Sequence, residues 1–485
     1  MSAHLSDTPW ITWVILLPLI GAITCFMWPS YNRVSAMIST VATSLASLAL
    51  YQQLLDQGVI RYSMGGWGAP LGIDLYADGL SVVMLLITAV VGLGVSLYSL
   101  AYFKQNDGNP AGFWPLWLML WTGINGLFLA GDVFNLYVTL ELLGLSAVAL
   151  VALAGSQEAL SGAMRYLLVS LLGSLCYLLG VALLYHGYGT VDIQLLGIAV
   201  GSHPAAYAAL ALMVAALALK SALFPLHFWL PPAHASAPTP VSALLSALVV
   251  KASFYLLLRL WFDVFPLLTP NIGWVLGALG AAAIVWGSIQ ALRQSRLKLL
   301  VAYSTVAQLG YLFLPFAFVS PLAWQGGVYF ALSHALAKAA MFMAAGNMLK
   351  FGGHDRIADL DRVAQRLPIT MTAFCLAGVS LMGLPPSGGF LAKWLLLEAA
   401  LTHQQWLWAV VMIVGGLLAA AYVFKVVGHA FTQANIPHEA QPVPLTLEWA
   451  ALALAVAAIV LGLNATYPMA LLEIGAPFSL AGPSP

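Results

Sequence analysis

Long uninterrupted apolar runs constrain the fold of this chain more than any other feature. A chain inside hydrocarbon must satisfy its own backbone hydrogen bonds, so an apolar run of about 20 residues indicates a helix that spans a bilayer. We identify fourteen such runs, at 10–28, 34–55, 79–103, 113–130, 131–155, 162–187, 204–224, 239–265, 273–293, 299–316, 325–349, 368–395, 403–431 and 445–466. The runs are continuous rather than alternating, which excludes a strand barrel. The sequence therefore predicts an all-α polytopic membrane protein with about 14 transmembrane helices.

The composition excludes a soluble protein of this length. Charged residues make up 7% of the 485 residues, against roughly 25% in soluble domains, so we expect a single membrane domain over 1–485. The formal net charge is zero, which gives no reason to expect a nucleic-acid partner. Neither a dinucleotide-binding glycine motif nor a phosphate-binding loop occurs, and the three cysteines lie far apart. We therefore expect no cofactor and no metal ion, and any redox chemistry must belong to another chain.

Basic residues between the predicted spans lie almost entirely on one side. The odd-numbered loops hold 10 or 11 Lys and Arg residues, whereas the even-numbered loops hold only Arg61. Because Lys and Arg favour cytoplasmic loops, we expect the odd loops to face the cytoplasm and both termini to lie on the other side of the cell inner (cytoplasmic) membrane. This count assigns Lys298 to a loop. Arg259, near the end of the eighth span, is expected to extend its charged end to the membrane interface.

Proline and glycine interrupt two of the predicted spans. The seventh ends in FPLHFWLPPAHASAPTP and the twelfth contains GLPPSGGF. The interrupting residues are Pro225, Pro231, Pro232, Pro385, Pro386 and Gly388. Non-helical backbone survives at membrane depth only where protein covers it or where it lines a wet cavity. Ordinary proline kinks remain the alternative.

The positions of the two breaks predict an internal repeat. Spans 7 and 12 are five spans apart and therefore run in opposite directions, which is typical of inverted repeats built around broken helices. We expect two inverted five-helix repeats, spans 4–8 (113–265) and spans 9–13 (273–431). Three N-terminal helices (10–103) precede them and one helix (445–466) follows.

Ionisable residues occur inside the predicted spans, where a charge costs at least about 2.5–3.5 kcal/mol. They are Glu141 in span 5, Lys220 in span 7, Lys251 in span 8, His334 and Lys338 in span 11, and Lys393 in span 12. We expect Glu141 and Lys220 to form an ion pair. Burial disfavours the charged form of a lysine and a nearby carboxylate favours it, so such a lysine can load and release a proton. Static ion pairs are the alternative, but one carboxylate cannot neutralise four buried lysines.

Other polar residues near these charges are candidate gates or relays. They are His227, His234, Ser304, Thr305 and Gln308. Histidine can carry a proton near neutral pH, while packed histidines and hydroxyls that join helices remain open alternatives. Asp132, at the start of span 5, is expected to be a helix-terminus residue rather than a relay.

Four segments carry a resemblance to a known family. LFPLHFWLPPAHASAPTPVSALLSALVVKASFY (223–255), RLKLLVAYSTVAQLGY (296–311), SHALAKAAMF (333–342) and GLPPSGGFLAKW (383–394) resemble the antiporter-like subunits of complex I and of Mrp-type cation/proton antiporters, closest to the D-type branch of the Mrp subunits. The resemblance implies fourteen helices in two inverted repeats, an axis of charged and hydrated residues, and other membrane subunits as partners. It also implies that Glu141 pairs with Lys220, that Lys251 is the central lysine and that Lys393 is the terminal one.

The function that this resemblance implies is proton transport through one subunit of a multisubunit Mrp-type Na⁺(cation)/H⁺ antiporter, with no redox chemistry of its own. Protons would move along the charged residues of the spans. Because the spans hold no cluster of carboxylates, we expect any Na⁺ site at a subunit boundary or in a partner chain. The alternatives are the equivalent pump subunit of a complex I-like NADH-quinone oxidoreductase or membrane-bound hydrogenase, or the energising subunit of an inorganic-carbon uptake complex. Four buried lysines argue against a structural scaffold.

Overall fold

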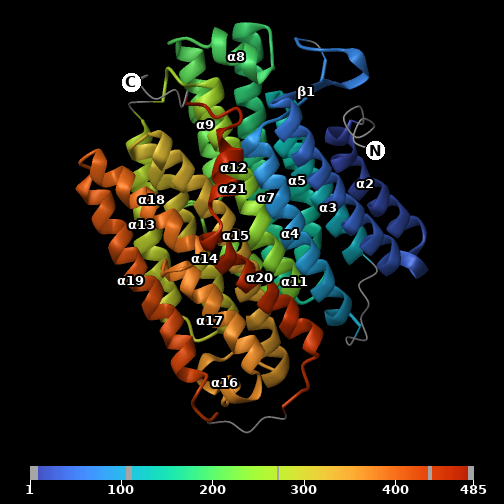
Figure 1. Ribbon diagram of the computed structural model, residues 1–485, viewed down its shortest axis with the longest axis vertical. Helices are drawn as coiled ribbons and strands as arrows, with labels where there is room; N and C mark the ends of the chain where they lie inside the picture. The colour runs from blue at the N-terminus through green and yellow to red at the C-terminus, as the bar shows by residue number, and fades with distance from the viewer. Residues whose placement is uncertain (1–8, 71, 105–111, 270–271, 435–439, 479–485) are drawn as a thin grey trace.

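The computed structural model describes residues 9–70, 72–104, 112–269, 272–434 and 440–478. Figure 1 shows long helices that run roughly along the longest axis of the molecule. The labelled elements β1 and α8 lie at the upper end in this view, and α16 lies at the lower end. Because β1 and α8 belong to even-numbered loops and α16 to an odd-numbered loop, the two sets of loops lie at opposite ends of the bundle.

The elements of the first half begin with two helices, a short hairpin and a third long helix. In order they are α2 (Trp10–Met27), η1 (Pro29–Tyr31), α3 (Asn32–Gln57), β1 (Ile60–Ser63), η2 (Met64–Gly66), β2 (Asp74–Ala77), α4 (Gly79–Tyr102), α5 (Phe113–Leu129), α6 (Val133–Ala152), α7 (Gln157–Tyr188), α8 (Ile193–Ala199), α9 (Pro204–Lys220), α10 (Leu230–Ser236), α11 (Thr239–Leu244), the π-helical η3 (Leu245–Val249), α12 (Val250–Arg259) and the π-helical η4 (Leu260–Val264).

The second half is helical in all its described elements. They are α13 (Gly273–Arg293), α14 (Leu297–Phe313), η5 (Leu314–Ala317), α15 (Pro321–Gly352), η6 (Ile357–Asp359), α16 (Val363–Arg366), α17 (Pro368–Met382), α18 (Gly388–Thr402), α19 (Trp406–His429), α20 (Leu445–Leu463) and α21 (Thr466–Glu473). Across the described residues, 11 helical segments are long and apolar enough to cross a membrane, and α5, α9 and α17 are shorter apolar helices. The chain is therefore a multi-pass membrane protein.

Burial separates inner helices from outer ones. The most apolar parts of the segment from α11 to η4 and of α15 are completely buried inside the protein. By contrast α2, α19 and α20 expose large apolar side chains such as Phe26, Leu417 and Trp449. An apolar exterior is expected where lipid or another membrane subunit is the neighbour. The charged residues of α12 and α15 are consequently shielded from lipid.

Both interrupted spans break where the sequence predicts. Helix α9 ends at Lys220 and α10 begins at Leu230, with Pro225 in the intervening turn, while α17 ends at Met382 and α18 begins at Gly388. Pro385 and Pro386 lie in this second break. Part of the prediction is wrong, because Pro231, Pro232 and Gly388 do not interrupt a helix. Pro231 and Pro232 lie in the first turn of α10, where a proline ring is tolerated because the first turn's N–H groups have no intrahelical partner, and Gly388 is the first residue of α18.

A short antiparallel hairpin, which the apolar pattern does not predict, joins α3 to α4. Strands β1 and β2 pair in register from Ile60 opposite Ala77 to Ser63 opposite Asp74. Four-residue strands are too short to show an alternating pattern in the sequence. The hairpin matters because it places Arg61 over the end of the bundle.

Candidate functional site

The predicted ion pair between Glu141 and Lys220 is present, and helix α7 completes it. Lys220 is the last residue of α9, and its Nζ lies 3.5 Å from Glu141 Oε1 on α6. The same Nζ donates to Ser170 Oγ at 2.9 Å, and Ser174 donates to Glu141. The two serines are one helical turn apart on α7, so both charges of the pair bond to one additional helix. Neither serine is among the candidate residues predicted from the sequence.

Lys251 lies directly after a π-helical turn. Its Nζ donates to the carbonyl of Ser246 within η3, and the Ser246 hydroxyl is 2.9 Å from Thr305 Oγ1 of α14. Single π-helical turns inside α-helices occur frequently at functional sites because they leave carbonyl groups free for other partners. Lys251 is 1% exposed. Among the ion pairs of the described residues, Lys220 is the one of the four predicted lysines that has a carboxylate partner.

Helix α15 places His334 and Lys338 in the core. Lys338 donates to the carbonyl of Val301 at 3.0 Å and to Ser304 Oγ, both on α14. His334 stacks on Phe330, and within the described residues neither of its buried ring nitrogens has a hydrogen-bond partner. Buried polar atoms of this kind are normally satisfied by ordered water. The lysines within electrostatic range of His334 are Lys251, Lys338 and Lys393.

Lys393 holds the two halves of the broken twelfth span together. From α18 it donates to the carbonyl oxygens of Leu381 at 2.7 Å and Met382 at 3.3 Å, which end α17. These carbonyls have lost their intrahelical partners, and a cation at a helix C-terminus also favours the helix dipole. The half-buried Lys393 borders a cleft of about 420 Å³ together with Gly383 and Trp394.

The described contacts bring some of the candidate relays to the lysines but not others. Ser304 bonds to Lys338 and Thr305 to Ser246, as described above. His234 in α10 is fully buried, and neither ring nitrogen has a partner among the described residues. Gln308 instead donates to Tyr422 Oη at 2.9 Å. His227 is half-buried and stacks on Phe224.

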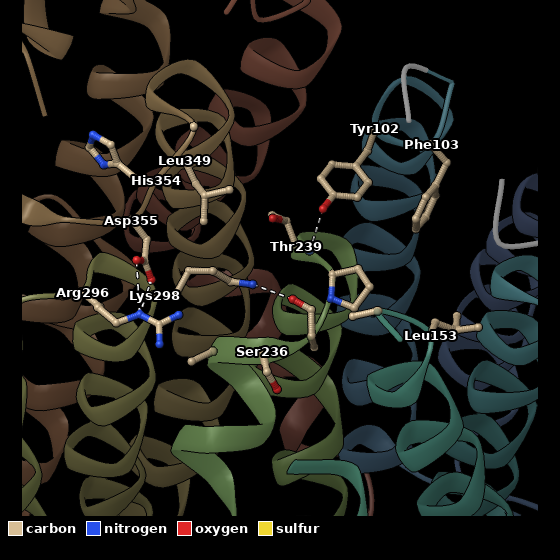
Figure 2. A pocket seen from close by; sticks show the side chains of 15 residues that line it. Tyr102, Phe103, Leu153, Ser236, Thr239, Arg296, Lys298, Leu349, His354 and Asp355 are labelled. Atoms are coloured by element: carbon tan, nitrogen blue, oxygen red, sulfur yellow. Dashed lines mark hydrogen bonds and ion pairs between the residues drawn. The ribbon is translucent and has the colours of Figure 1, made fainter. Parts of the chain in front are cut away.

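A cleft of about 660 Å³ opens near the ends of α4, α14 and α15 (Figure 2). Lys298 reaches across it and donates to the carbonyl of Ala237 at 2.6 Å, while Arg296 Nε donates to Asp355 Oδ2 at 2.9 Å. The assignment of Lys298 to a loop is wrong, because α14 begins at Leu297 and the side chain of Lys298 is buried. The lysines within electrostatic range of His234 are Lys251, Lys338 and Lys298. Lys298 thus lines the cleft and also lies within electrostatic range of His234.

Arg259 does not extend to the membrane interface, so that prediction is also wrong. Its guanidinium donates to both oxygens of Asp78, at 2.7 and 2.5 Å, and to the hydroxyls of Ser81 and Tyr255. Asp78 also accepts from the backbone N–H of Ser81 and so caps α4. A bidentate carboxylate lets the arginine stay buried. Since Asp78 is 181 residues away along the chain, no local pattern could reveal the pair.

Comparison with known families finds two family models that match this chain. The family described as "NADH:quinone oxidoreductase/Mrp antiporter, TM" matches residues 130–419. Residues 67–113 match the family described as "NADH-Ubiquinone oxidoreductase (complex I), chain 5 N-terminus". The first match covers more than half of the chain and includes all six predicted charged residues.

Curated relatives and solved structures agree with these family matches. The chain is 35% identical to the N-type subunit of NADH-quinone oxidoreductase of Desulforudis audaxviator, over 89% of this chain and 87% of the relative. It is 29% identical to the D-type subunit of the Na⁺/H⁺ antiporter of Bacillus subtilis, over 86% of each chain. A chain of the Mrp complex from Dietzia sp. superimposes with a TM-score of 0.88 at 25% identity, covering 97% of this chain and 98% of the other. A chain of an archaeal membrane-bound sulfane sulfur reductase does so with the same score at 27% identity, covering 96% and 97%.

Proposed function

The chain belongs to the NADH:quinone oxidoreductase/Mrp antiporter family of membrane proteins, and on that premise we propose that it transports protons as one subunit of a multisubunit Mrp-type cation/proton antiporter. One observation carries the proposal: four lysines lie within the helices of a membrane protein, three of them buried and Lys393 half-buried, and the described residues give a carboxylate to Lys220 alone among the four. Permanent charge on all four would be costly in that environment. Lysines that exchange protons with one another avoid this cost, because not all of them are charged at once.

The proton path we propose runs sideways through the bundle. It begins at Glu141 and Lys220, continues through Lys251 and the α15 pair of His334 and Lys338, and ends at Lys393. A charge on one lysine disfavours a charge on the next, so each protonation step promotes release from the neighbour. The unpartnered ring nitrogens of His334 and His234 support water-filled connections between the side chains.

Fold and orientation form part of the same proposal. The 11 long helices, the three shorter apolar ones and the two breaks support fourteen crossings arranged as inverted repeats over 113–265 and 273–431. We assign the odd-numbered loops to the cytoplasm and both termini to the opposite side of the inner membrane. The cleft at Lys298 and Asp355 then faces the cytoplasm and supplies protons to the path through His234.

A second candidate is the equivalent pump subunit of a complex I-like oxidoreductase. The 35% identity to an N-type subunit of NADH-quinone oxidoreductase favours it, as does the likeness to a chain of a sulfane sulfur reductase. Both candidates use the same buried charges and differ in the partner chains. Mass spectrometry of the gently solubilised complex would distinguish them, because redox subunits accompany the chain only in the second case.

The transport proposal is tested by replacing the central lysine in the intact complex. Lys251→Met keeps the length of the side chain but cannot carry a proton, so we expect proton movement in membrane vesicles to fall to background while the complex stays assembled. Lys350→Met is the matched control, because Lys350 lies at the end of α15, outside the path. Transport that persists in Lys251→Met at the level of the control would overturn the proposal.

A further inference from the structure

Two buried polar groups at the even-numbered-loop end of α6 and α7 are not used by the path above. Tyr177 on α7 is 0% exposed, and Asp132, the residue before α6, is 5% exposed. Neither Tyr177 Oη nor Asp132 Oδ2 has a hydrogen-bond partner among the described residues. The two side chains are within electrostatic range of each other. Polar groups left unpaired inside a protein normally mark a hydrated site.

Tyr177 connects this site to the ion pair of the path. It follows Ser174 by three residues on α7, about 4.5 Å along the helix axis, and Ser174 donates to Glu141. Helices α6 and α7 pack against each other. Ser174 and Tyr177 therefore lie in turn between Glu141 and Asp132, which is about 13.5 Å from Glu141 along α6.

On the side away from Tyr177, Asp132 adjoins a cluster of charged residues that is open to solvent. Backbone hydrogen bonds from Val133 to Val191 and from Gly131 to Asp74 hold three segments together around it. Arg61 bridges Asp74 at 2.6 Å and Asp192 at 2.5 Å. The side chain of Arg61 is 34% exposed and lines a cleft of about 460 Å³ at this end of the bundle.

We propose that Tyr177 and Asp132 form an outward branch of the proton path, which carries protons between Glu141 and the cleft at Arg61. This inference rests on the proposed transport function. A proton leaves the Glu141 carboxyl through Ser174 and water and binds at Tyr177 Oη as the tyrosine passes on its own hydroxyl proton. Asp132 accepts that proton at Oδ2 and releases it to water in the cleft. Ser174, Tyr177 and Asp132 end in their starting states, and Glu141 is left as a carboxylate that takes up its next proton from Lys220.

The surroundings of Asp132 suit this exchange. Burial raises the pKa of Asp132 to about 6. The backbone N–H groups of Asn135 and Phe134 oppose this rise in pKa, and the charges of Asp192 and Asp74 add to it. The groups that face Asp132 from the elements packed against it are Tyr177 on α7, Asp74 on β2 and Asp192 before α8, with Arg61 on β1 behind the two aspartates. A carboxyl with this pKa can both accept and release protons near neutral pH.

Two conservative substitutions test the branch in the intact complex. Asp132→Asn keeps an N-cap residue of equal quality for α6, where Asp132 Oδ1 accepts from the N–H of Asn135 at 2.6 Å. Tyr177→Phe removes a hydroxyl that makes no described hydrogen bond, so both variants are expected to assemble. Proton transport in right-side-out vesicles, followed with a pH-sensitive dye, should fall roughly a hundredfold in Asp132→Asn, as when a positioned acid–base group is lost. The transport rate should fall less in Tyr177→Phe, because a water molecule can take the place of the lost hydroxyl.

Two controls make the result decisive. Tyr329→Phe removes a buried hydroxyl that donates to Leu461, far from the branch in sequence, and should transport at the wild-type rate. In the wild type, transport should decline as the external pH drops below about 6, because Asp132 then stays protonated; the residual transport of Asp132→Asn should lack that decline.

The outcomes separate this inference from the transport proposal. Wild-type rates and an unchanged pH profile in Asp132→Asn and Tyr177→Phe, with Lys251→Met inactive, would overturn the branch alone. Activity retained in Lys251→Met would overturn the transport proposal, and the branch with it. If the complex with Asp132→Asn fails to assemble, the test rests on Tyr177→Phe. A wild-type rate of proton transport in Tyr177→Phe would then overturn the branch.

Discussion

At the scale of the residue, oxygen atoms from hydroxyl and carbonyl groups surround each buried lysine. Lys220 and Lys338 bond to serines, and Lys338, Lys251 and Lys393 bond to backbone carbonyls; Lys220 also has the Glu141 carboxylate. Such neutral partners solvate an ammonium group without fixing its charge, so they are compatible with both protonation states. A carboxylate at every lysine would instead favour the charged form throughout.

The charged residues of the site could be predicted from the sequence, whereas most of their partners could not. A lysine in an apolar run is conspicuous, which is why Glu141, Lys220 and Lys251 were identified. Ser174 bonds to Glu141 from 33 residues away, and serine is common in membrane helices. The environment of Arg259 was predicted incorrectly for the same reason, since Asp78 lies on a distant part of the chain.

The ion pair between Lys220 and Glu141 should stabilise the protein only when both residues are present. Glu141→Gln leaves Lys220 buried without a counter-charge, and breaking a buried pair typically destabilises a protein by about 3–5 kcal/mol. We expect the apparent melting temperature of the solubilised complex to fall, and the double variant Glu141→Gln, Lys220→Met to recover much of the loss. Glu158→Gln, at a side chain that is 73% exposed, is the control. Equal stability of the single and double variants would contradict this account.

The pair between Arg259 and Asp78 should be structural. Asp78→Asn removes the charge that compensates a buried guanidinium, and we expect a loss of about 3–5 kcal/mol. Arg259→Lys should also destabilise, because an ammonium group cannot reproduce the bidentate geometry. Thermal unfolding of the purified complex measures both effects. A melting temperature unchanged in both variants would show that the buried pair is dispensable.

At the scale of the element, irregular helices position the charges. Proline and glycine made the breaks in spans 7 and 12 predictable, and the regular helix α13 was predicted at its observed bounds, 273–293. The π-helical turn η3 was not predicted, because it inserts an extra residue per turn without a characteristic residue type. The hairpin of β1 and β2 was not predicted either, because strands of four residues are too short to show an alternating pattern in the sequence.

Removing the extra residue of η3 should misplace Lys251. Deletion of Ala247 converts the turn towards α-helical geometry, in which the Ser246 carbonyl accepts an intrahelical N–H and is no longer free to bond Lys251 Nζ. We expect proton transport to be lost although the helix still spans the membrane, whereas Ala247→Gly, which keeps the residue count, should retain measurable transport. Vesicle transport assays compare the two. Full activity of the deletion variant would show that the π-helical turn does not position Lys251.

At the scale of the whole molecule, the two sets of loops lie at opposite ends, and orientation is the property to test. Cysteines introduced at the exposed positions Arg362 and Gln194, in a chain whose Cys25, Cys176 and Cys375 are replaced by alanine, report on the two ends. An impermeant thiol reagent added to intact cells should label Gln194→Cys and leave Arg362→Cys unmodified until the membrane is opened. The reverse pattern would invert the assigned orientation.

The position of Lys393 beside an open cleft has a consequence for experiments on the purified chain. The other lysines of the row are enclosed by helices of this chain, but the last one borders a space that the fold itself leaves unfilled. Whatever occupies that space in the native assembly sets the electrostatic environment of the final donor. In a detergent-solubilised monomer the ammonium group of Lys393 would contact detergent or water instead. The proton-transport rate measured on that monomer would therefore differ from the rate in the assembled complex.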